Sequence, residues 1–181
     1  MSQELEVLKT VTRRLSEGNL AYMVTGSIAM NYYVVPRMTR DIDIVLELTE
    51  SSVDQAVKLF QSDFYVDRNM VREAALRKSM FNIIHNTYVI KVDFIVRKDN
   101  EYRRTEFSRR KQVEIDGQMV SIVAPEDLIL SKLEWAKDSH SEMQLNDVRN
   151  LIKGEYPLDQ QYIFQWVNQL GLTDIYQKAT G

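Results

Sequence analysis

Hydrophobic residues recur along the chain in two spacings that predict different elements. Leu5, Leu8 and Val11 lie three residues apart, as on the apolar face of an amphipathic helix. Elsewhere, short continuous apolar runs are bounded by Gly, Pro, Asn or Asp, which is the pattern of buried strands separated by turns. These runs predict strands at residues 21–25, 41–48, 64–66, 80–85, 88–96, 112–115 and 119–123. The helical spacing predicts helices at residues 5–17, 27–34, 53–61, 101–109, 126–138, 141–153 and 158–170.

The order of the elements changes character at Pro125. Strands and helices are mixed before it, whereas only helices are predicted after it. We therefore expect an α/β (α+β) fold, with a mixed β-sheet flanked by helices over residues 1–124 and a C-terminal helical region packed on this core over residues 125–181. Trp135 and Trp166 fall at apolar helical positions of that region, so we expect both in its core. Residues 69–78 form a connection whose type the pattern leaves open.

Two aspartates interrupt the apolar run at residues 41–48. Because successive side chains of a strand alternate faces, Asp41 and Asp43 are expected to point the same way. Carboxylates in such proximity repel each other unless a cation neutralises them. Asp93 is a third carboxylate inside an apolar run, and if the two strands are neighbours, three carboxylates meet on one sheet face and suit a divalent ion such as Mg²⁺. The alternative is three solvated carboxylates with a structural role.

The run at residues 21–25 ends in Gly26-Ser27, directly before a predicted helix. Glycine lets the backbone approach a ligand closely, and the amides at a helix N-terminus attract phosphate oxygens. A Gly-Ser pair alone is most often only a turn. Its combination with the three aspartates favours a site for a phosphorylated substrate.

Gly26-Ser27, Asp41-Ile42-Asp43 and Asp93, in this order, resemble the nucleotidyltransferase fold superfamily, the group that includes polymerase-β-like enzymes. The resemblance implies a transferase that moves a nucleoside monophosphate from a nucleoside triphosphate, ATP among them, to an acceptor hydroxyl and releases pyrophosphate. It implies that Asp41 and Asp43 hold two Mg²⁺ (or Mn²⁺) ions and that Asp93 completes the metal site. Asp93 would also orient or deprotonate the acceptor hydroxyl.

The resemblance continues on either side of these motifs. The sequence Arg37-Met38-Thr39-Arg40 is similar to small prokaryotic members, and Pro125-Glu126-Asp127-Leu128 with Lys132 and Asp147 is similar to abortive-infection toxin-type nucleotidyltransferases. This implies, as an alternative function, a toxin that acts on tRNA and has a cognate antitoxin. A surface position is the alternative for Lys132, and a structural or capping role is favoured for Asp147. The residues implied to bind the nucleotide are Gly26, Ser27, Arg40 and Lys132.

The composition excludes some of the functions that a chain of this size could have. The chain of 181 residues contains no cysteine, which excludes disulfides, thiolate metal sites and cysteine nucleophiles. A formal net charge of −3 gives no whole-chain support for non-specific nucleic-acid binding. No apolar run approaches the length of about 18 residues that spans a membrane, and the first residues are acidic and polar, so we expect a cytoplasmic protein.

The segment from Arg97 to Lys111 is a local basic cluster, with seven Lys or Arg and three acidic residues. It is either a solvated helix with internal ion pairs or a docking surface for a polyanionic acceptor such as RNA. The sequence therefore leaves three candidates for the acceptor, which are RNA, a protein hydroxyl and a small molecule. The alternative to an active enzyme is a non-catalytic relative that binds a nucleotide or a protein partner.

Overall fold

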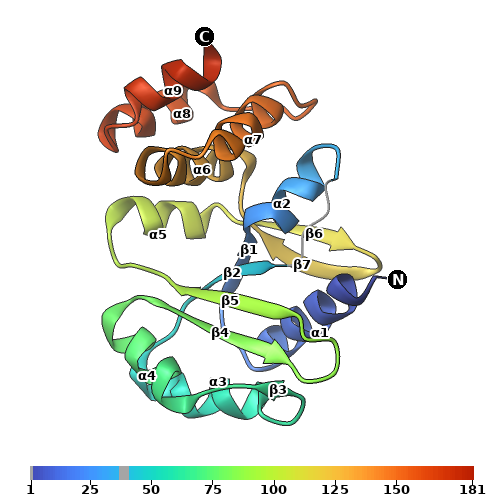
Figure 1. Cartoon of the computed structure of the whole chain (residues 1–181). Coiled ribbons are helices and arrows are strands. Elements are labelled where there is room, and N and C mark those ends of the chain that lie inside the picture. Colours follow the sequence, from blue (N-terminus) through green and yellow to red (C-terminus); the bar gives the residue numbers. More distant parts are fainter. Residues whose placement is uncertain (1, 37–40) are drawn as a thin grey trace.

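A seven-stranded mixed sheet forms the centre of the computed structural model, which describes residues 2–36 and 41–181 (Figure 1). The strand order is β3-β4-β5-β2-β1-β7-β6. β1 runs parallel to β7 and β2 runs parallel to β5, whereas the other neighbours are antiparallel. The mixed sheet confirms the predicted fold class. The strands are β1 (Tyr22–Thr25), β2 (Ile42–Leu46), β3 (Phe64–Tyr65), β4 (Met80–His85), β5 (Lys91–Val96), β6 (Lys111–Ile115) and β7 (Gln118–Ile122).

Helices cover both faces of the sheet. In the view of Figure 1, α1, α3 and α4 lie below it, while α2, α5 and α6 lie above it, with α7, α8 and α9 stacked beyond α6. A 3₁₀ turn at Glu50–Ser52 precedes α3. The helices are α1 (Gln3–Glu17), α2 (Gly26–Tyr33), α3 (Val53–Phe60), α4 (Arg68–Arg77), α5 (Glu101–Ser108), α6 (Pro125–Ser139), α7 (Glu142–Ile152), α8 (Gln160–Gln169) and α9 (Thr173–Thr180).

The two faces of the central strands differ in polarity. Ile42, Ile44 and Phe94 are fully buried on one face, because alternate residues of β2 and β5 point into the same apolar layer. The ring of Phe94 lies 5.9 Å from that of Phe60, which identifies this layer as the one under α3. Asp43 alternates with Ile42 and Ile44 and therefore faces the opposite side, towards α2 and α6.

Helix α6 joins the sheet to the C-terminal helices, and it packs against α2, α7, α8 and α9. Trp166 of α8 is buried, with its ring 4.9 Å from that of Tyr102 on α5, as predicted. The prediction for Trp135 is wrong, because this side chain is 59% exposed. Apolar residues occur around most of α6, so helical spacing alone does not tell which of its sides other elements leave uncovered.

Three local features differ from the sequence-based expectation or complete it. The connection left open is helix α4, whose N-terminal amides at Asn69 and Met70 donate to the Asp67 side chain. Strand β2 begins at Ile42, so Asp41 precedes the strand rather than lying within it. Helix α9 lies beyond the last predicted helix, and only two of its eight residues, Tyr176 and Ala179, are buried.

Within the described residues, no helix is both long enough and apolar enough to span a lipid bilayer.

Candidate functional site

Gly26 begins α2 at the point where this helix leaves β1, next to Asp43 on the neighbouring strand. Its φ angle is +62°, in the left-handed region that favours glycine. A Cβ atom at residue 26 would lie 2.1 Å from Oδ2 of Asp43, so any larger residue would displace this carboxylate. The glycine thus brings the start of an eight-residue helix close to a carboxylate, while its contact with a phosphate stays a prediction.

The strand register places two of the predicted carboxylates side by side. Asp43 of β2 is the direct partner of Asp93 of β5 in the parallel pair. Neighbouring strands are about 4.8 Å apart, so side chains on the same face at this register adjoin each other. The Asp93 side chain is only 14% exposed, whereas that of Asp41, just before β2, is 62% exposed. Asp41 therefore lies at the solvent side of the pair.

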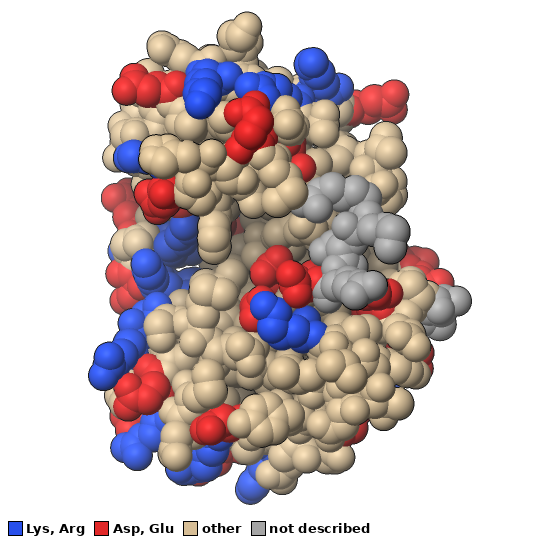
Figure 2. Space-filling view, in the orientation of Figure 1, with Lys and Arg blue, Asp and Glu red and all other residues tan. Residues whose placement is uncertain are grey.

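A pocket of about 240 Å³ opens over this pair of carboxylates. Figure 2 shows a hollow between the upper and lower halves of the molecule, with acidic and basic side chains together at its lower edge. Asp41 does not line this pocket, and Arg40 lies outside the described residues. The predicted site residues that line the pocket are Gly26, Ser27, Asp43, Asp93 and Lys132.

The carboxylates of this pocket strongly influence one another. Burial, followed by repulsion from Asp93 and Asp41, raises the pKa of Asp43 to about 6, and the attraction of Lys91 and Lys132 only partly offsets this rise. The Lys91 ammonium lies 2.7 Å from Oδ2 of Asp93 and 3.9 Å from Oδ1 of Asp41. Sequence reasoning missed Lys91, although its position two residues before Asp93 on the same strand places both side chains on one face.

The three predicted metal ligands are all carboxylates, which is the ligand chemistry that a hard divalent cation prefers. Arranged as they are, no three His, Asp or Glu side chains in the described part of the chain could hold a metal ion. The Lys91 ammonium instead contacts two of the three predicted ligands, so a cationic group already lies beside these oxygens. In the arrangement described, Asp41, Asp43 and Asp93 therefore do not form a metal site, and their role as ligands stays a prediction.

Lys132 of α6 lies in the wall of the pocket and is only 5% exposed, so the alternative of a surface position is wrong. Its Nζ donates to Oδ2 of Asp147 at 2.6 Å and to Oε1 of Gln144 at 3.1 Å, both on α7. Asp147 is itself buried, so the pair holds the ammonium at a fixed position. A buried ammonium beside a carboxylate pair is well placed to contact a polyanion.

Comparison with known proteins defines the family. Residues 4–176 match a protein family described as nucleotidyl transferases of unknown function (DUF2204). The chain belongs to this family. No curated protein is significantly similar to it in sequence.

Solved nucleotidyltransferase structures share the fold of this family member. An antigenic nucleotidyltransferase-like protein from Paracoccidioides brasiliensis is 19% identical, with a TM-score of 0.54 over 83% of this chain and 75% of that one. A putative nucleotidyltransferase from Thermotoga maritima is 18% identical, with a TM-score of 0.53 over 77% and 88% of the two chains. The lincosamide antibiotic adenylyltransferase LnuA, in its lincomycin-bound form, is 11% identical, with a TM-score of 0.53 over 84% and 98%.

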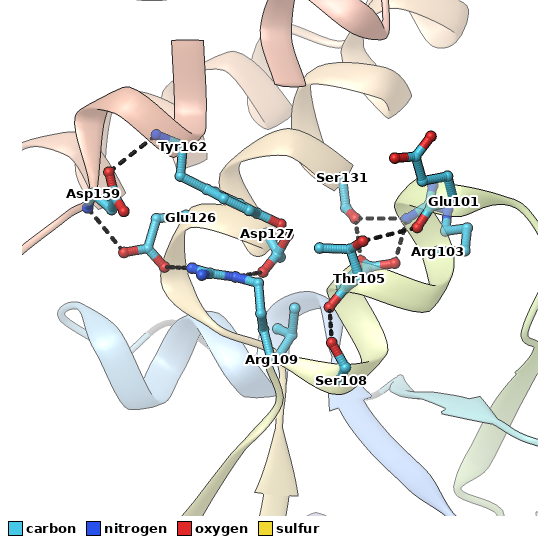
Figure 3. Close-up of polar contacts among 12 residues, drawn as sticks. Glu101, Arg103, Thr105, Ser108, Arg109, Glu126, Asp127, Ser131, Asp159 and Tyr162 are labelled. Atoms are coloured by element: carbon cyan, nitrogen blue, oxygen red, sulfur yellow. Dashed lines mark hydrogen bonds and ion pairs between the residues drawn. The ribbon is translucent and has the colours of Figure 1, made fainter. Parts of the chain in front are cut away.

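Four of the seven basic residues in the segment from Arg97 to Lys111 pair with carboxylates of this chain. Arg97 pairs with Glu47 at 2.7 Å, and Arg104 pairs with Asp99 at 2.9 Å. Arg103 and Arg109 are held by buried or half-buried acidic residues of α5 and α6 (Figure 3). These contacts favour a helix whose basic residues form ion pairs, mostly with α6 and with the residue that follows β2, over a docking surface for RNA.

Proposed function

We propose that this chain is an active nucleotidyltransferase that transfers a nucleoside monophosphate from a nucleoside triphosphate to an acceptor hydroxyl. The observation that carries the proposal is the register of Asp43 with Asp93 beneath Gly26. It joins a carboxylate pair, whose mutual repulsion favours a bound cation, to the backbone amides of a helix N-terminus, which favour phosphate. The family match supports nucleotidyl transfer in general.

The proposed roles follow from the positions of the residues. The amides at Gly26 and Ser27 would bind the β- and γ-phosphate oxygens, and the ammonium of Lys132 would contact the same polyanion from the opposite wall. Asp41, Asp43 and Asp93 would hold two Mg²⁺ or Mn²⁺ ions, which supply Lewis-acid stabilisation of the entering and leaving oxygens. Arg40, implied by resemblance, would add a further phosphate contact.

The bond changes in the proposed reaction assign a separate role to Asp93. The acceptor hydroxyl oxygen bonds to the α-phosphorus, while the bond from that phosphorus to the bridging oxygen of pyrophosphate breaks. Asp93, on the strand beyond Asp43, would orient the hydroxyl and accept its proton. Pyrophosphate then leaves from the side of Gly26 and Ser27. The order of these residues across β1, β2 and β5 supports opposite positions for the entering and leaving groups.

The test is incubation with each α-labelled nucleoside triphosphate, Mg²⁺ or Mn²⁺, and cell extract, followed by separation of RNA, protein and small molecules. We expect one class to carry label in the wild type and none in Asp43→Asn. Asp54→Asn is the matched control, because Asp54 is an exposed carboxylate that pairs with Arg68 on the side of α3. Label in tRNA would support the toxin alternative, and label in a small molecule would match the chemistry named for LnuA.

Two results would contradict the proposal. One is wild-type protein that binds no nucleotide in the presence of Mg²⁺ or Mn²⁺ and releases no pyrophosphate. The other is equal labelling by the wild type and Asp43→Asn. Nucleotide binding without any transfer would instead support the non-catalytic alternative.

A further inference from the structure

A second pocket, of about 160 Å³, adjoins the first on the side of α5. Its floor is formed by Val45 and Ile95, each two residues beyond Asp43 or Asp93 on the same strand and the same face. At about 3.3 Å per residue, this floor lies roughly 6.6 Å along the strands from the carboxylates. The residues that line both pockets are Thr25, Met80, Ile95, Ser131 and Trp135, so the two form one continuous space.

The mouth of this space carries two exposed apolar side chains. Trp135 on α6 is 59% exposed and Met80 on β4 is 49% exposed. Large apolar side chains exposed at the rim of a pocket beside a polar site are typical of ligand-binding grooves. Figure 2 shows this hollow open to solvent between the halves of the molecule. An indole offers a flat face on which a planar ligand can stack.

The far wall of the second pocket is polar and rigid. Nη1 of Arg103 donates to Oε2 of Glu106 at 2.7 Å and to Oγ of Ser131 at 3.2 Å, and Oγ of Ser131 donates to Oε1 of Glu106 at 2.9 Å. Nη2 of Arg103 donates to Glu134. Glu106 is only 2% exposed, so this network fixes the wall (Figure 3). The pocket thus combines an apolar floor, an aromatic side and hydrogen-bonding groups at its end.

We propose that the second pocket holds the base of the nucleoside triphosphate, stacked against Trp135. This inference rests on the proposed function. In that reaction the leaving group, the α-phosphate and the acceptor succeed one another across β1, β2 and β5, and the nucleoside, attached through another oxygen of the α-phosphate, extends away from this line. The second pocket lies to one side of this line, along the strands from the carboxylates, and is continuous with the first pocket. A base, which is planar and carries both donors and acceptors, matches its apolar floor and polar wall.

The chain provides its own reporter, because Trp135 and Trp166 are its two tryptophans. In Trp166→Phe, tryptophan fluorescence comes from Trp135 alone. We expect a nucleoside triphosphate with Mg²⁺ to quench this fluorescence, and inorganic tripolyphosphate with Mg²⁺ to bind without quenching it. Should Trp166→Phe fail to fold, the difference between the wild type and Trp135→Phe gives the same signal.

Affinity provides the second readout. Trp135→Ala should weaken binding of the nucleoside triphosphate about tenfold, within the range for loss of one aromatic stack, and leave tripolyphosphate affinity unchanged. Trp135→Phe should retain most of the affinity. Phe164→Ala is the matched control, because Phe164 is a similarly exposed aromatic residue on α8 that lines neither pocket.

The outcomes separate the two proposals. Tripolyphosphate binding together with unquenched Trp135 and unchanged nucleotide affinity in Trp135→Ala would overturn the base site and leave the proposed function standing. A Trp135→Ala variant that raises only the KM of the acceptor would also overturn it, because the pocket would then hold the acceptor. Failure of both tripolyphosphate and nucleotide to bind would overturn both proposals.

Discussion

Two clusters of acidic residues lie on the same side of the sheet, and they differ in how their charges are balanced. In the cluster at the start of α6, both oxygens of Asp127 accept a hydrogen bond, one from Nε of Arg109 at 2.9 Å and one from the Tyr162 hydroxyl at 2.6 Å. Both oxygens of Glu126 also accept, from Arg109 and from the Asp159 amide. Figure 3 shows the Arg109 guanidinium between the two carboxylates and beside the Tyr162 ring.

The cluster around Asp43 is not balanced in this way. The Lys91 ammonium lies beside Asp93 and Asp41, while the nearby Lys132 ammonium is paired with Asp147. Burial and repulsion raise the pKa of Asp43 to about 6. Buried acidic residues with complete partners hold the structure together, whereas repelling carboxylates with a raised pKa in a pocket are candidates for a functional role.

The largest expected contrast is in activity. Asp43→Asn should lower nucleotide transfer by on the order of 10³-fold or more, because it removes a central oxygen ligand of the metal ions that stabilise the transition state. Asp54→Asn should leave the rate unchanged. The measurement is pyrophosphate release with the labelled acceptor class. A fully active Asp43→Asn variant would show that the unbalanced cluster is not the catalytic site.

For the balanced cluster at the start of α6, the expected effect of a mutation is on stability rather than on activity. Arg109→Met should lower the free energy of unfolding by about 2–3 kcal/mol, because it leaves the buried carboxylates of Glu126 and Asp127 without their cation. Urea denaturation measures this loss. Arg104→Met is the control and should change stability by less than about 0.5 kcal/mol, since its partner Asp99 is exposed. Equal effects of the two variants would contradict the structural role of the balanced cluster.

Stability of the metal-free protein should depend on pH through Asp43. Its pKa is raised from 3.8 to about 6 in the folded state, so the folded protein binds this proton more tightly than the unfolded chain. The resulting stabilisation is complete below about pH 4, decreases as the pH rises and is lost above about pH 6. Its size is on the order of 1–2 kcal/mol, after allowance for partial exposure of the side chain.

The measurement is urea denaturation in EDTA between pH 4 and pH 7 for the wild type and Asp43→Asn. The difference between the two proteins isolates Asp43 from other buried acids, such as Asp127, whose pKa burial also raises. We expect the variant to be the more stable protein at pH 7. If the free energy of unfolding changed with pH in the same way for both proteins, the pKa of Asp43 would not be raised in the folded state.

The smallest expected effect is at Lys91. Lys91→Met removes a cation that lies beside two of the predicted ligands, so Mn²⁺ should bind about fivefold more tightly, as expected from roughly 1 kcal/mol of repulsion in a solvated site. The free Mn²⁺ signal in electron paramagnetic resonance reports the affinity at low salt. Unchanged or weaker binding would mean that Lys91 does not compete with the metal.

Local patterns were enough to predict the carboxylate cluster but not its surroundings. Alternation along a strand predicted the shared face of Asp43 and Asp93, and the apolar run before Gly26 predicted that this residue follows a strand and precedes a helix. The pairing of Lys132 with Asp147 and the exposure of Trp135 depend on how α6 packs against α7 and the sheet. Such packing is set by contacts distant in sequence, which periodicity does not encode.

The most direct test of the central claim is Mn²⁺ binding in the presence of a nucleoside triphosphate, because it requires no knowledge of the acceptor. Electron paramagnetic resonance would compare the wild type, Asp43→Asn and the control Asp54→Asn at equal protein concentration. We predict nucleotide-dependent Mn²⁺ binding in the wild type and in Asp54→Asn, and its loss in Asp43→Asn. Equal binding by all three proteins, or none by the wild type, would contradict the assignment of Asp41, Asp43 and Asp93 as the metal site.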